Sequence, residues 1–335
     1  MLDREPEELQ FLGVVGILAE AIKILRSCVK QLGAITLTLI LPLSFAILGH
    51  TLVSDPLIHK IERNEDTFEK QAGSPDADRT MALIYSEWTR FLLFQGGYLV
   101  FLLAFSLLST AAVVYTVACI YTGKQITYAK VMSVVPRVWK RLMLTFLWYF
   151  LIMIGYNTAV MVTFVVVILT VGVDNTVAFG LCVVVLLAVF LAVHVYISAI
   201  WHVASVISVL EDRYGIGAIK KSRDLIKGKR LVAFVLIFFY FVVWAVIQGI
   251  FRKKVVHVSG GGGIGSRVGF GVLLVGLLVY VNLIGLLVQS VLYYVCKSYH
   301  HQSIDKSALS DHLEEYLGEY VPLKSSNIQM ENLDI

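Results

Sequence analysis

Residues 177–210 of this chain read VAFGLCVVVLLAVFLAVHVYISAIWHVASVISVL and contain no Asp, Glu, Lys or Arg. A helix needs about 20 consecutive apolar residues to cross the hydrocarbon core of a bilayer. This segment is considerably longer, so we expect a transmembrane helix that tilts or projects beyond the hydrocarbon.

Five further segments have the same character. They are Leu32–Val53, Phe91–Ile120, Leu142–Val173, Leu231–Phe251 and Val268–Cys296. Over all 335 residues, 58% are hydrophobic and 16% charged, against about 25% charged in soluble domains. The mean hydropathy is +0.78. Together with only six Pro, four Cys and aperiodic Gly, this composition excludes soluble, disordered, collagen-like and disulfide-scaffold classes.

The distribution of positive charge predicts the orientation of these spans. On one side of the predicted membrane lie 19 Lys and Arg residues, and nine lie on the other. The positive-inside rule therefore places both termini in the cytosol. Thr51–Trp88 becomes an acidic loop on the opposite side. The few residues around Asp174 predict a tight antiparallel hairpin between the third and fourth spans.

A basic amphipathic pattern precedes the first, third and fifth spans. The three copies are Ala21–Leu32, Ala129–Leu142 and Ala218–Leu231. In the third copy, Ile216, Ile219 and Ile226 recur at helical spacing, with the cations elsewhere on the helical wheel. Such helices lie in the headgroup plane of a membrane. We therefore predict an all-α integral membrane protein with six transmembrane helices in three hairpins, each preceded by an interfacial helix.

This predicted architecture divides the chain into three parts. Residues 1–30 form a cytosolic N-terminus with an interfacial helix, and residues 31–298 form the six-helix membrane domain. Residues 299–335 form a cytosolic tail. In this tail Asp311 and Glu314 predict a capping box, followed by an apolar stripe that offers a docking surface to a protein partner or to the basic helices.

The segment Val209–Lys229, reading VLEDRYGIGAIKKSRDLIKGK, resembles the signature of a plant family of uncharacterised multi-pass membrane proteins. Leu2–Leu12 and Glu319–Lys324 fit the same family, so the resemblance covers nearly the whole chain. The spacing from Glu211 to Gly228 is also similar to the bacterial membrane domain found beside glycerophosphodiester phosphodiesterases. This second resemblance implies a fold, because the catalytic metal-binding domain is absent. The plant family implies no reaction.

Cations are concentrated in the same segment. They are Lys220, Lys221, Arg223, Lys227, Lys229 and Arg230. Each cation close to an anionic leaflet contributes about 1 kcal/mol of binding. The segment is interpreted either as a structural elbow at the membrane surface or as a contact site for anionic lipid or a partner protein.

Polar groups inside the spans are few. His194 and His202, with Asn157, could line a polar pocket; alternatively they form interhelical hydrogen bonds. The Gly-rich loop from Ser259 to Ser266 lacks the Lys-Ser/Thr of a phosphate cradle and is interpreted as a linker.

No metalloprotease, Walker or nucleophile-elbow motif occurs, and no metal, cofactor or nucleic acid is predicted. The sequence therefore favours a non-enzymatic membrane protein that organises lipids or partner proteins through its cytosolic helices. The alternative is a carrier or channel for a small solute or lipid. The compartment is predicted to be the endoplasmic reticulum or the plasma membrane.

Overall fold

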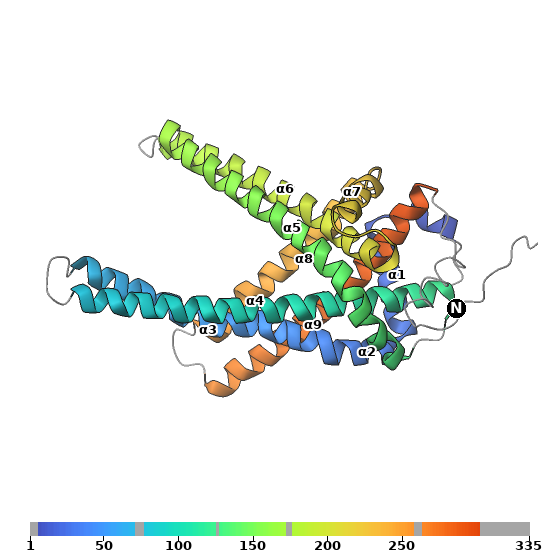
Figure 1. Ribbon diagram of the computed structural model, residues 1–335, viewed down its shortest axis with the longest axis horizontal. Helices are drawn as coiled ribbons and strands as arrows, with labels where there is room; N and C mark the ends of the chain where they lie inside the picture. Colours follow the sequence, from blue (N-terminus) through green and yellow to red (C-terminus); the bar gives the residue numbers. More distant parts are fainter. Residues whose placement is uncertain (1–5, 71–76, 125–126, 172–175, 258–262, 302–335) are drawn as a thin grey trace, which may run out of the picture.

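The computed structural model describes residues 6–70, 77–124, 127–171, 176–257 and 263–301 (Figure 1). All regular structure in these ranges is helical. The elements are η1 (Pro6–Phe11), α1 (Val14–Ser27), α2 (Val29–Ile35), η2 (Thr36–Ile40), α3 (Leu41–Lys70), α4 (Ala77–Thr122), α5 (Tyr128–Val171), α6 (Thr176–Leu210), α7 (Ile216–Leu225), α8 (Arg230–Phe251), η3 (Arg252–Val256) and α9 (Ile264–Tyr299).

Six of the described helical stretches are long and apolar enough to cross a membrane. They are Val29–Lys70, Asp78–Thr122, Tyr128–Val171, Thr176–Leu210, Arg230–Val256 and Ile264–Tyr299. The first of these combines α2, η2 and α3 into one rod. The prediction of an all-helical chain with six candidate spans is confirmed.

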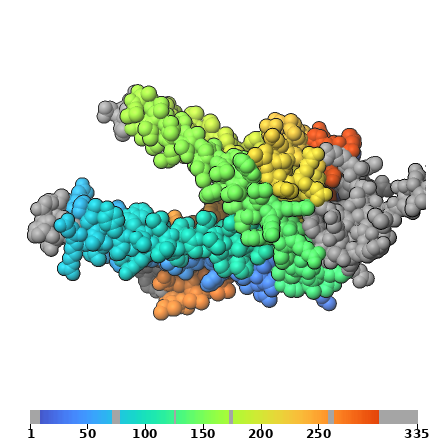
Figure 2. Space-filling model, viewed as in Figure 1, coloured from blue at the N-terminus to red at the C-terminus, as the bar shows by residue number. Residues whose placement is uncertain are grey.

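The long helices diverge from a common body. α3 contacts α4, α5 contacts α6, and α8 contacts α9. Figure 2 shows open space between the α5–α6 arm and the α3–α4 arm. The most apolar 18-residue windows of α5 and α6 contain no buried residue, and Leu169 is 78% exposed. Apolar surface of this kind is suited to contact with lipid chains, which are as apolar as leucine.

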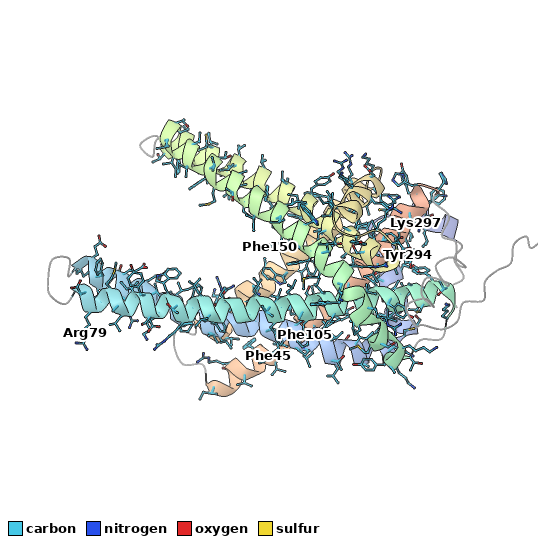
Figure 3. All side chains as sticks on the ribbon, in the orientation of Figure 1. Phe45, Arg79, Phe105, Phe150, Tyr294 and Lys297 are labelled. Atoms are coloured by element: carbon cyan, nitrogen blue, oxygen red, sulfur yellow. The ribbon has the colours of Figure 1, made fainter. Side chains whose placement is uncertain are left out.

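The protein core lies where α1 and α7 meet the ends of α4, α6 and α9. Tyr293 and Tyr294 on α9 are each 1% exposed. Tyr294 stacks at a tilt on Tyr121 from α4, with ring centroids 4.5 Å apart. Figure 3 shows Tyr294 and Lys297 at this end and Arg79 at the far tip of α4.

The predicted acidic loop Thr51–Trp88 is instead largely helical. α3 continues to Lys70, and α4 begins at Ala77. The two helices are joined there by polar contacts: Lys60 Nζ donates to Glu87 Oε1 at 2.7 Å, and Trp88 Nε1 donates to Glu65 Oε1 at 3.2 Å. Charged residues paired across two helices can extend a hairpin beyond the apolar span, which apolar periodicity alone does not reveal.

The predicted interfacial helix Ala129–Leu142 is not a separate element. It forms the first turns of α5, which runs without interruption from Tyr128 to Val171. Val131, Val134, Val138 and Leu142 are all buried. Their spacing places them on one face of the helix, so this apolar stripe packs against protein.

The third copy forms a separate helix, α7, whose buried face matches the predicted one in part. Ile226 is buried and Ile219 is partly buried, as predicted, whereas Ile216 is 38% exposed. Ala218, Ser222 and Leu225 are also buried. The smaller side chains allow α7 to lie close to α6, which it contacts extensively. The tail with its predicted helix at Asp311, the turn at Asp174 and part of the Gly-rich loop lie outside the described residues.

Candidate functional site

A small polar cavity lies between α3, α4, α6, α8 and α9. Its volume is about 110 Å³. Its polar lining residues are Ser106, Ser109, Thr110, His202, Ser205, Tyr240, Asn282 and Gln289. These described lining residues offer hydroxyl, amide and imidazole groups without a carboxylate or an ammonium group, so the cavity is suited to neutral polar groups.

Hydrogen bonds across this cavity join different helices. His202 Nδ1 lies 2.6 Å from Gln289 Oε1, and because an amide oxygen only accepts, this bond needs the tautomer protonated at Nδ1. The Tyr240 hydroxyl donates to Asn282 Oδ1 at 2.9 Å, and Asn282 Nδ2 donates to Ser44 Oγ at 2.9 Å. Nε2 of Gln289 is buried and finds no hydrogen-bond partner within the described ranges. The amide group of Gln289, which lines the cavity, therefore retains unused donor capacity.

The structure does not bring the predicted trio of His194, His202 and Asn157 together. Only His202 lines the cavity. His194 lies among aromatic rings, with its centroid 5.5 Å from that of Phe241. Asn157 is exposed, and its Nδ2 donates to the carbonyl of Met153 one turn earlier in α5. His194 therefore packs among aromatic side chains, and Asn157 forms a hydrogen bond within its own helix.

A larger hollow lies beside α7, at the end of the molecule that contains the core. Its volume is about 590 Å³. We call it the basic hollow; it is lined by Arg213, Gly217, Lys220, Lys221, Asp224, Leu225, Lys227 and His300. Among the predicted contact residues, Lys220, Lys221 and Lys227 line it, whereas Arg223, Lys229 and Arg230 do not.

The charges of the basic hollow are only partly compensated. Lys227 Nζ donates to Asp224 Oδ1 at 2.6 Å. This hydrogen bond holds the pKa of Asp224 below its ordinary value, so Asp224 is ionised. Arg213 and Lys220 are exposed, and in the part of the chain that the structure describes neither forms an ion pair. The hollow therefore presents net positive charge to its surroundings.

A half-buried ion cluster supports one wall of the hollow. Glu211 accepts hydrogen bonds from Lys221 Nζ and, at 2.7 Å, from the Tyr293 hydroxyl, and Lys297 Nζ lies 3.5 Å from the same carboxylate. Burial acts to raise the pKa of Glu211, but the hydrogen bonds from Lys221 and Tyr293 and the charge of Lys297 outweigh it. The pKa consequently lies below its ordinary value, and Glu211 joins α6, α7 and α9 as an anion.

Backbone geometry sets the position of α7. Gly215 has φ of +63°, a conformation that side-chain-bearing residues rarely adopt. Its N–H donates to Thr145 Oγ1 at 2.8 Å, and Ser222 Oγ donates to the carbonyl of Ile200 at 2.7 Å. The chain therefore turns sharply after α6 and returns along it, which places the cations of α7 on the outer face.

Sequence reasoning missed two of the basic side chains that line the basic hollow, Arg213 and His300. Arg213 stands in the turn before α7, outside the run of cations, and His300 follows the last predicted span. His300 lies against α7: its Nε2 is 3.0 Å from the carbonyl oxygen of Leu225. Arg213 could have been found from its place in the quoted segment. No local signal links His300 to residues about 75 positions earlier.

Among the described residues, no three His, Cys, Asp or Glu side chains are grouped as for a metal ion. The fold defines the class: an all-helical protein with six helices suited to cross a membrane, a polar cavity among them and a basic hollow at one end. The chain belongs to the family Domain of unknown function (DUF8558), whose model matches residues 2–333. No curated protein and no solved structure matches it. The resemblances to plant and bacterial families stay predictions.

Proposed function

We propose that this chain is a non-enzymatic multi-pass membrane protein whose cytosolic face binds the phosphate-bearing headgroups of anionic lipids in the basic hollow. The observation that carries this proposal is the hollow itself, where Arg213 and Lys220 converge without a paired carboxylate among the described residues. Each such cation close to an anionic surface contributes about 1 kcal/mol. Tyr214 and Ile216, both exposed beside the hollow, offer apolar contact to the same lipids.

The proposed arrangement in the membrane follows from this function. α3 with α4, α5 with α6, and α8 with α9 would form three transmembrane hairpins, with both termini and α7 in the cytosol. The excess of Lys and Arg on that side supports this orientation. The compartment would be the endoplasmic reticulum or the plasma membrane. The tail would bind a protein partner, as an interaction separate from lipid binding.

The test is binding of dihexanoyl phosphatidylserine, a monomeric short-chain lipid, to the purified full-length protein in neutral detergent. The double variant Arg213→Gln/Lys220→Gln removes two cations, and at about 1 kcal/mol each it should bind the lipid roughly 30-fold more weakly. The dissociation constant is measured by titration at low salt, because salt screens exposed charges.

The control variant Lys23→Gln/Lys30→Gln removes two exposed cations from the same proposed face, outside the hollow. It should change the dissociation constant by less than threefold. Equal weakening by both double variants would mean diffuse attraction to the whole surface and would overturn the site.

The polar cavity favours a second candidate function, a carrier for a small neutral solute. Its unused Gln289 donor is the specific observation in its support. Unchanged lipid binding in the Arg213→Gln/Lys220→Gln variant, together with flux of small polar solutes in proteoliposomes, would favour this candidate.

A further inference from the structure

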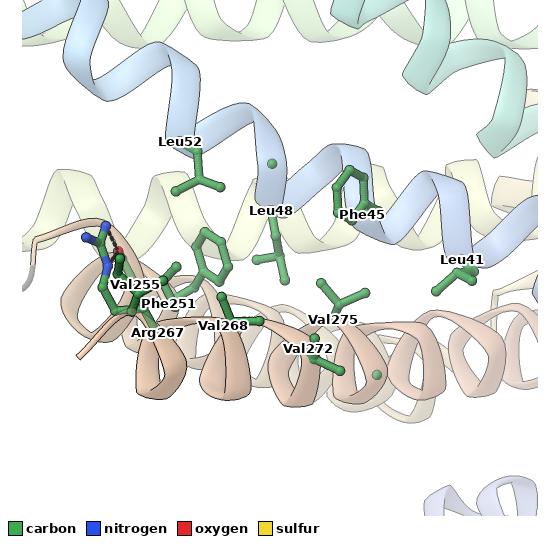
Figure 4. A pocket seen from close by; sticks show the side chains of 14 residues that line it. Leu41, Phe45, Leu48, Leu52, Phe251, Val255, Arg267, Val268, Val272 and Val275 are labelled. Atoms are coloured by element: carbon green, nitrogen blue, oxygen red, sulfur yellow. Dashed lines mark hydrogen bonds between the residues drawn. The ribbon is translucent and has the colours of Figure 1, made fainter. Parts of the chain in front are cut away.

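An apolar groove lies between α3, α9 and the segment that joins α8 to η3 (Figure 4). Its volume is about 680 Å³. All of its lining residues are apolar or glycine except Arg267. Phe45 and Leu52 on α3 are 67% and 44% exposed, so the groove opens to the surface that would face lipid chains.

The length and direction of the groove correspond to one leaflet. On α3 it extends from Leu41 to Leu52, a distance of about 16 Å at about 1.5 Å per helical residue. This is roughly half of the ~30 Å hydrocarbon core. Leu41 lies near the middle of the uncharged run Leu32–Val53 within this candidate span and Leu52 lies near the end of that run, so in the proposed orientation the groove runs from the membrane centre to the non-cytosolic surface.

A fixed positive charge marks the surface end of the groove. Arg267 donates from both Nε and Nη2 to the carbonyl of Val255, at 3.1 and 2.8 Å. These bonds hold the guanidinium beside the groove but leave its charge uncompensated, since Arg267 forms no ion pair within the described ranges. Lys253 and Lys254, exposed in the adjacent η3, add charge at this end. Arg252 is paired with Asp55 at 3.6 Å.

We propose that this groove holds one acyl chain of an anionic glycerophospholipid from the non-cytosolic leaflet, with its phosphate group against Arg267. An apolar groove of leaflet length that ends at a guanidinium matches an acyl chain followed by a phosphate. Arginine forms bidentate hydrogen bonds with phosphate oxygens. A second copy of this chain fits less well, because a two-fold interface at this groove would bring two Arg267 side chains toward each other.

The experiment is native mass spectrometry of the full-length protein in mild detergent, titrated with palmitoyl-oleoyl phosphatidylglycerol or phosphatidylcholine. The variant Gly276→Leu should fill the groove, since a Cβ at Gly276 meets no heavy atom within 4 Å. We expect it to bind phosphatidylglycerol at least tenfold more weakly than the native chain. Arg267→Gln should remove most of the preference for phosphatidylglycerol over phosphatidylcholine.

The matched control is Gly269→Leu. A Cβ at Gly269 also meets nothing within 4 Å, and Gly269 does not line the groove. Lipid binding should stay within twofold of the native chain. Arg213→Gln/Lys220→Gln should also retain the lipid in the groove, which separates this inference from the proposed cytosolic site.

Two results would overturn the inference. Equal lipid binding by Gly276→Leu and Gly269→Leu would mean that the lipid belongs to an unspecific annulus. A dimer that is lost in Gly276→Leu while lipid binding is unchanged would assign the groove to a second copy of the chain.

Discussion

Replacing Glu211 by Gln is expected to lower the free energy of unfolding by about 3 kcal/mol, because breaking a buried ion pair leaves uncompensated charge behind. The Glu211 side chain is 14% exposed, and those of Lys221 and Lys297 are each 21% exposed. Glutamine can still accept hydrogen bonds but does not neutralise the two ammonium groups. Thermal unfolding of the purified protein, followed by tryptophan fluorescence, measures the effect.

The matched control is the adjacent residue. Asp212 Oδ1 accepts a hydrogen bond from Arg141 at 3.0 Å, but its side chain is 76% exposed. Exposed pairs of this kind contribute about 0–1 kcal/mol, so Asp212→Asn should have a small effect. Equal destabilisation by the two variants would contradict the structural role assigned to Glu211.

The destabilisation caused by Glu211→Gln depends on pH, and the pKa of Glu211 sets its direction. The pKa of Glu211 in the folded protein lies below the ordinary value of 4.5. The stability that ionised Glu211 contributes is therefore present above about pH 4.5 and is lost as the pH falls through the lower, folded-state pKa. The difference in stability between the native chain and Glu211→Gln should narrow on acidification below that pH.

Replacing Gly228 by Ala is expected to cost about 2 kcal/mol, since a left-handed backbone disfavours any Cβ by roughly 1–2 kcal/mol before steric contacts are counted. Gly228 has φ of +91°, and an added Cβ would lie 2.2 Å from Cε1 of Tyr299. The Tyr299 ring lies 5.4 Å from Lys229 Nζ, and the next residue, His300, lines the basic hollow. We therefore expect both a lower melting temperature and weaker lipid binding.

Gly217→Ala is the control for Gly228→Ala. Gly217 is the second residue of α7, and a Cβ there meets no heavy atom within 4 Å. Alanine is favoured over glycine in helices by at most about 1 kcal/mol, so this variant should be at least as stable as the native chain. A melting temperature for Gly228→Ala at or above the native value would show that the turn after α7 is not constrained as described.

The six candidate spans could be predicted because each depends only on local composition. The uncharged run from Val177 to Leu210 is α6 almost residue for residue. The helical extensions around Lys60 and Glu87 could not be predicted in this way. They depend on pairing between side chains 27 residues apart, across two helices.

The basic hollow could likewise be predicted only where it depends on local sequence. The run of cations from Lys220 to Lys227 located the basic hollow, because charge density is a local property. The pairing of Glu211 with Tyr293 and the approach of His300 to α7 join residues more than 70 positions apart. The contact of His202 with Gln289 is of the same kind. Helical periodicity assigns a residue to a face but does not identify the helix that this face meets.

The placement of the basic hollow and the groove on opposite sides of the membrane is tested most directly by labelling lysines. The native chain is labelled in sealed vesicles whose cytosolic face points outward. All four informative residues, Lys220, Lys227, Lys253 and Lys254, are exposed. A membrane-impermeant amine reagent, with the modified peptides identified by mass spectrometry, should label Lys220 and Lys227 in intact vesicles. It should label Lys253 and Lys254 only after permeabilisation. Labelling of all four lysines in intact vesicles, or of Lys253 and Lys254 alone, would contradict a basic hollow in the cytosol with an acyl-chain groove on the opposite leaflet.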